Sequence, residues 1–150
     1  MVDPAPLIPT EEPEHQFDPD EQLYFRVRPD EHVLDAVTLE DIPSLPLSVN
    51  RGSLSQPEDV IANYPGWGII GFPVKAIPKT LAAEQGDTEY QFRIVTKVEH
   101  GNEAHADIEC LKNGKRVEKS SKISETVKLK FRESIRRHAR WIRRPDNPSQ

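Results

Sequence analysis

His105 and Asp107 are the two residues whose types and spacing most directly suggest chemistry. They lie two positions apart in a stretch where polar and apolar residues alternate. Side chains two apart on a β-strand point to the same side, so the imidazole and the carboxylate would share one face with Glu109. Such a pair can orient a general base. If the chain is an enzyme, His105 and Asp107 are its predicted catalytic residues; the alternative, which the sequence favours, is a solvated polar strand face.

The sequence offers no signature of a metal or cofactor site. It contains one cysteine, Cys110, which excludes an intrachain disulfide and a zinc site built from several cysteines. A metal at His105 would need further ligands, and the chain has no HExxH, CxxC or Walker motif. We therefore expect neither metal nor cofactor. Cys110 falls on the apolar side of its stretch beside Val117, where it would act as a small buried hydrophobic residue.

A second group of residues could bind an anion or an aromatic ligand. Arg51 and Ser53 precede a short predicted helix, whose free backbone N–H groups favour anions, and Arg26 could converge on the same place. Trp67, flanked by two glycines, could serve as a platform for a ligand. Helix capping by the Arg51–Ser53 segment and a core position for Trp67 are the simpler alternatives, and the sequence favours both.

The C-terminal part of the chain carries a row of cations. Apolar residues recur every three or four positions from Ile123 to Ile142, which predicts a long helix over Ser121–Arg144. That helix would align four arginines beside its apolar stripe, namely Arg132, Arg136, Arg140 and Arg143. Regularly spaced cations suit a phosphate backbone, so residues 128–144 are a candidate nucleic-acid site. A solvated helix face and an acidic partner, either another protein or a segment of the same chain, are the alternatives.

Charge and proline content divide the chain into parts. The net charge is −5, yet residues 110–150 hold 13 Lys and Arg against 4 Asp and Glu. Residues 1–22 contain five prolines, seven carboxylates and no Lys or Arg. Such a segment has too little apolar surface to offset the entropy lost on ordering. We therefore expect a disordered acidic arm over residues 1–22, a single domain over residues 23–145 and a disordered tail over residues 146–150.

Several short elements must position these residues. Strand-forming runs are predicted at Leu23–Val27, Leu47–Asn50 and Trp67–Phe72, a short helix after Ser55, and one or two helical turns over Ile77–Ala83.

The strongest pattern is the alternation at about residues 89–119, which predicts a three-stranded antiparallel meander. Asn113-Gly114 fits a type I′ turn that pairs Lys112 with Lys115. The expected fold is α+β: a small antiparallel sheet, including this meander, packed against the long C-terminal helix.

Three separated pieces of the sequence resemble a known group. Leu23–Val27, Gly66–Ile69 and Ala104–Ala106 are similar to the LYRR-like, GWG-like and AHA-like pieces of a group of short uncharacterised bacterial proteins. The resemblance spans about residues 23–145. It implies a bacterial grouping and no activity, and it draws attention to His105 within the third piece. Phe25 stands where the group more often has an arginine.

The location follows from what the sequence lacks. No apolar run approaches the roughly 18 residues of a membrane span, and the N-terminus lacks the basic and apolar regions of a signal peptide. We therefore expect a cytoplasmic protein without membrane contact.

The leading functional interpretation is a non-enzymatic binding or accessory protein whose partner is another protein. One alternative is a small enzyme or toxin-like effector that uses His105 with Arg51 and Arg26. The other is a nucleic-acid-binding protein that uses the basic helix. The sequence leaves open whether the chain is an enzyme.

Overall fold

The computed structural model describes residues 17–30, 34–83, 88–98 and 102–147. Its strands are β1 (Gln22–Val27), β2 (Leu47–Arg51), β3 (Gly68–Pro73), β4 (Thr80–Ala82), β5 (Glu89–Thr96), β6 (His105–Lys112), β7 (Lys115–Arg116) and β8 (Arg140–Arg143). Its helices are α1 (Pro57–Val60) and α2 (Glu125–His138), with 3₁₀ turns η2 (Leu39–Asp41), η3 (Val74–Ala76) and η4 (Ser120–Lys122).

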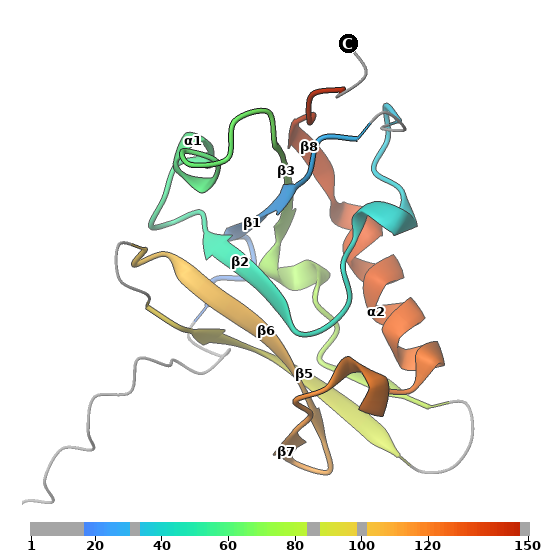
Figure 1. The fold of residues 1–150 in the computed structure, drawn as a ribbon. Coiled ribbons are helices and arrows are strands. Elements are labelled where there is room, and N and C mark those ends of the chain that lie inside the picture. The colour runs from blue at the N-terminus through green and yellow to red at the C-terminus, as the bar shows by residue number, and fades with distance from the viewer. Residues whose placement is uncertain (1–16, 31–33, 84–87, 99–101, 148–150) are drawn as a thin grey trace, which may run out of the picture.

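All the strands belong to one antiparallel sheet, and α2 packs on one face of it (Figure 1). The strand order is β4-β5-β6-β2-β1-β3-β8, and β7 pairs with β6 beside this path. The protein is therefore α+β, but the sheet has eight strands and is not the small sheet expected. The sequence misses β4, whose three residues are too few to show an alternating pattern, and β8, whose residues it assigns to the C-terminal helix.

The core lies between the sheet and α2. Each central strand turns alternate side chains to this side, among them Leu23 and Phe25 in β1, Leu47 and Val49 in β2, Phe92 and Ile94 in β5, and Ala106 and Ile108 in β6. Val127, Phe131 and Ile135 of α2 pack against them, and the rings of Phe92 and Phe131 stack with centroids 5.1 Å apart. Burial of one phenylalanine side chain contributes about 1.5–3 kcal/mol, so this contact anchors the helix on the sheet.

The predicted hairpin between β6 and β7 is confirmed. Lys112 pairs with Lys115, and the two turn residues have positive φ angles, 55° at Asn113 and 80° at Gly114. The Val117 N–H donates to the Cys110 carbonyl at 2.8 Å, as the expected register requires. Cys110 is buried in the core, and burial raises the pKa of its thiol to about 11. A thiol held protonated in this way is a packing group and not a nucleophile.

The predicted long helix ends early. Helix α2 stops at His138, Ala139 takes an extended conformation, and the chain enters β8, where Ile70 pairs with Trp141 and Gly71 with Arg140. A side chain at Gly71 would lie only 3.0 Å from Ile142, so this glycine allows β8 to lie against β3. Trp141 and Ile142 are good strand formers. Residues 140–143 therefore belong to the sheet, although their apolar spacing fits a helix.

The expected helical turns over Ile77–Ala83 are also absent. Thr80–Ala82 form β4, an edge strand that pairs with β5 through Thr80 with Gln91 and Ala82 with Glu89. Pairing with β5 determines the conformation here, because it provides partners for backbone N–H and C=O groups that a single helical turn would leave without a hydrogen bond.

The folded part begins earlier than expected. Phe17 is buried, and the guanidinium of Arg51 lies 4.2 Å from the centre of its ring. Residues 17–22, assigned above to the arm, thus pack against the folded domain, while residues 1–16 lie outside the described residues.

The tail likewise begins later than expected. The Asp146 N–H donates to the Gly66 carbonyl at 2.8 Å, and the Asp146 carbonyl accepts the Asp30 N–H at 3.2 Å. Residues 148–150 lie outside the described residues.

We predict that Gly114→Val lowers the free energy of unfolding by about 1–2 kcal/mol, because a β-branched residue resists a positive φ angle. No described atom lies within 4 Å of the Cβ position at Gly114, so the loss would be one of backbone conformation and not of packing. Urea denaturation measures it. Gly114→Asn is the control and should lose less, because asparagine tolerates this conformation. Equal stability of Gly114→Val and the wild type would contradict the assignment.

Candidate functional site

The face of the sheet opposite α2, here called the outer face, is polar because the strands alternate. It carries Tyr24 and Arg26 from β1, Ser48 and Asn50 from β2, and His105, Asp107 and Glu109 from β6. The register sets Asn50 between Tyr24 and His105, and Ser48 opposite Asp107. The two predicted catalytic residues therefore share one face, as expected from their spacing.

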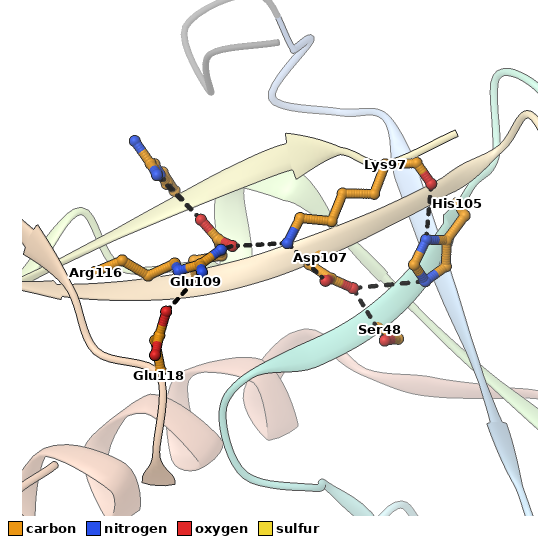
Figure 2. A network of polar contacts seen from close by, with 8 residues as sticks. Ser48, Lys97, His105, Asp107, Glu109, Arg116 and Glu118 are labelled. Carbon is orange, nitrogen blue, oxygen red and sulfur yellow. Dashed lines mark hydrogen bonds and ion pairs between the residues drawn. The ribbon is translucent and has the colours of Figure 1, made fainter. Parts of the chain in front are cut away.

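Both nitrogens of the His105 imidazole have a polar neighbour (Figure 2). Nδ1 lies 2.9 Å from the carbonyl oxygen of Lys97, and a carbonyl only accepts, so Nδ1 carries a hydrogen. Nε2 lies 3.5 Å from Oδ1 of Asp107. The backbone therefore orients the ring, and the Asp107 carboxylate lies on the opposite side of it.

Asp107 has further partners besides His105. Its Oδ1 accepts a hydrogen bond from the Ser48 hydroxyl at 2.9 Å, and its Oδ2 lies 3.4 Å from Nζ of Lys97. Asp107 thus stands between Ser48 and His105. A serine nucleophile needs a direct hydrogen bond to its base, and here the serine hydroxyl donates to the carboxylate instead.

Glu109 continues the network towards β7 (Figure 2). Its side chain is only 4 % exposed, and Arg93, Lys97 and Arg116 each approach it to 3.1 Å. Burial alone would raise the pKa of Glu109, but the hydrogen bonds from these three cations outweigh burial and hold the pKa below its ordinary value of 4.5. The spacing predicts that Glu109 lies on this face but does not indicate its burial, because Arg93, Lys97 and Arg116 come from other parts of the chain.

Arg51 and Ser53 hold a carboxylate of the chain itself. Arg51 donates through Nε and Nη2 to Glu21 at 2.9 and 3.0 Å, and the Ser53 hydroxyl donates to Glu21 at 2.8 Å. Burial would raise the pKa of Glu21, and these contacts outweigh it and lower the pKa. The predicted anion-binding residues therefore fix the start of β1, and Arg51 does not line the cleft described next.

A cleft of about 490 Å³ opens on the outer face between the sheet and the segment around α1. Arg26 and His105 both line it, together with Asn50, Asn102 and Tyr64. Arg26 lies over the Tyr64 ring at 4.0 Å and donates to the Val60 carbonyl at 3.3 Å. The structure thus brings together two of the three residues of the predicted enzyme site, Arg26 and His105, but not Arg51.

The sequence missed the amide and tyrosine residues of this cleft. Asn50 stands in the polar register of β2, which is the only signal that it faces outward. Asn102 and Tyr64 come from loops, and no spacing rule relates loop residues to a strand.

Trp67 is half-buried and does not line the cleft. Its ring packs 5.0 Å from Tyr64 and 5.8 Å from the Arg28 guanidinium. It therefore supports the wall of the cleft through Tyr64.

The predicted row of four arginines does not exist. Arg132 donates to the carbonyls of Ile42 and Leu39 at 2.8 and 2.7 Å, and Arg136 bonds to Glu133 one turn earlier. Arg140 and Arg143 lie on β8, where Arg140 donates to Gln22 at 2.8 Å. The early end of α2 breaks the row, because two of its four cations belong to a strand.

Comparison of the chain with protein-family models, with curated proteins and with solved structures finds no match in any of the three. Among residues 17–30, 34–83, 88–98 and 102–147, no group of three or more His, Cys, Asp or Glu side chains is arranged to hold a metal ion. Neither described helix has the length and hydropathy needed to cross a membrane.

We predict that Glu109→Gln lowers the free energy of unfolding by about 1–3 kcal/mol near neutral pH, because three charge-assisted hydrogen bonds lose their anion. The pKa of Glu109 is lowered in the folded state, so its contribution is present above about pH 4.5 and is lost as the pH falls further. The difference between variant and wild type should therefore narrow on acidification.

Denaturant titrations at a series of pH values measure this difference. Glu118→Gln is the matched control, since Glu118 contacts the same Arg116 but its side chain is 74 % exposed. A difference for Glu109→Gln that stays constant down to about pH 3 would contradict the charge argument.

Proposed function

We propose that this protein is a non-enzymatic binding or accessory protein of the cytoplasm that receives a protein partner at the cleft beside Arg26. One observation carries the proposal. The acid–base residues of the outer face bond to one another, whereas Arg26 at the cleft keeps donors that no described carboxylate occupies.

The bonding of Asp107 and Glu109 favours binding over catalysis. Asp107 accepts from Ser48 and lies beside Lys97, and Glu109 is enclosed by three cations. A general base must be placed against the proton that it takes up. These carboxylates are placed against cations and a hydroxyl of the same face, which suits a rigid platform.

The composition of the cleft favours a protein partner. Tyrosine and arginine are enriched among the residues that dominate binding energy at protein interfaces, and the cleft presents Tyr64 against Arg26. Its volume of about 490 Å³ falls within the usual range of binding clefts, about 300–1,000 Å³. A cleft of this size accommodates a few residues of a partner.

A small enzyme is the second candidate, because His105 and Arg26 line the same cleft. In that case the ring of His105 would act through Nε2, since Nδ1 donates to the Lys97 carbonyl. Nucleic-acid binding through residues 128–144 has less support, because Arg132 uses its guanidinium on backbone carbonyls.

The experiment places a photo-crosslinking residue at Asn63, an exposed position on the cleft, in the cells that naturally make the protein. We expect a crosslinked protein partner that disappears in the additional variant Arg26→Gln. Leu129, which is 52 % exposed on α2, is the control position and should not capture the same partner.

The same samples distinguish a binding protein from an enzyme that modifies its partner. A partner that keeps its mass after incubation with the protein supports the proposal. A change in mass that His105→Gln abolishes would contradict it, as would an equal crosslink from Asn63 and Leu129.

A further inference from the structure

The two amides in the cleft have a fixed orientation. The Ala104 N–H, which can only donate, bonds to Oδ1 of Asn102 at 3.2 Å. Asn102 therefore presents its Nδ2, which donates to Oδ1 of Asn50 at 3.0 Å. The Ala104 N–H thus fixes the orientation of Asn102, and Asn102 in turn fixes the orientation of Asn50. The Oδ1 of Asn50 is occupied by this bond, so its NH₂ group is the part left to bind another partner.

That NH₂ group reaches the cleft and has no acceptor in the described part of the chain. Asn50 is only 7 % exposed, it lines the cleft, and none of the described residues accepts a hydrogen bond from its Nδ2. A group with two free N–H bonds at the wall of a cleft is suited to an acceptor that comes from outside.

Arg26 adds a positive charge close by. Tyr24 pairs with Asn50 across β1 and β2, and Arg26 lies two residues further along the same face of β1. Such diagonal neighbours are about 7–8 Å apart, within reach of a long side chain. Among the described residues Arg26 bonds to the Val60 carbonyl and has no carboxylate partner.

We propose that the cleft binds a carboxylate of the partner, with Asn50 and Arg26 as its donors. A carboxylate offers about four lone-pair positions, enough for the fork of Arg26 and the NH₂ group of Asn50 together. Asp59, the acidic residue in the cleft, accepts the Gln56 N–H at 2.9 Å at the start of α1. This inference rests on the proposed function, because it names the group that the same cleft recognises.

The test is an NMR titration that follows the side-chain NH₂ signals of Asn50. Three probes separate the sources of the carboxylate: acetyl-Ala-Glu-Ala amide carries it on a side chain, acetyl-Ala-Ala-Ala acid carries it at the C-terminus, and acetyl-Ala-Gln-Ala amide has none. We expect at least one acidic peptide to shift the Asn50 signals and to bind at least about tenfold more tightly than the glutamine peptide. Equal binding of all three peptides, or no shift at Asn50, would overturn the inference.

Two variants test the donors. Arg26→Gln should weaken the acidic peptide about tenfold. Arg28→Gln is the matched control on the same stretch, because Arg28 is equally exposed but does not line the cleft, and it should bind like the wild type. If Arg26→Gln unfolds, Asn50→Asp is the second variant, because it replaces the donor by an acceptor of the same shape. It should abolish the preference for the acidic peptides over the glutamine peptide. A preference that survives in the folded variant would overturn the inference.

The two proposals fail in different ways. If no acidic peptide binds while the crosslink from Asn63 persists, the carboxylate inference is wrong and the binding function stands. If the acidic peptides bind but Asn63 captures no protein partner, the site recognises carboxylates and the proposed protein partner is wrong.

Discussion

The burial of Glu109 is the constraint on which the arrangement of the outer face depends. A buried carboxylate is stable only when cations and hydrogen bonds replace the water that it loses. Lys97 meets that requirement together with two arginines, and its Nζ also lies beside Asp107. The carbonyl of Lys97 in turn orients His105. One lysine thus connects the buried anion to the edge of the cleft.

This network divides the polar groups of the outer face into two sets. Those of β5, β6 and β7 neutralise one another and make a rigid, self-contained surface (Figure 2). Those at the junction of β1, β2 and the α1 segment keep donors directed at the cleft. The preference for binding over catalysis follows from this division, because the carboxylates best placed for acid–base chemistry belong to the first set.

Much of the fold follows from local patterns in the sequence. The alternation in β5 and β6 and the Asn113-Gly114 turn predict their pairing, because both depend on neighbours in the chain. Residues 139–143 could not be assigned in this way: their spacing fits a helix, and only contact with β3 makes them a strand.

The candidate site likewise contains residues that local spacing predicts and residues that only the fold brings in. His105 and Asp107 share a face as their spacing predicts, whereas Asn102 and Tyr64 join the cleft through loops. The sequence leaves an anion site at Arg51 open because the partner of Arg51, Glu21, lies in a segment with the composition of a disordered arm.

A crystal structure of the protein with acetyl-Ala-Glu-Ala amide tests the central claim most directly. We expect a carboxylate oxygen of the peptide within about 2.7–3.2 Å of both the Asn50 side-chain amide and the Arg26 guanidinium. Since a carboxylate only accepts, that contact would itself identify the Asn50 atom in the cleft as its nitrogen. A peptide bound elsewhere, or one whose carboxylate avoids Asn50, would contradict the account.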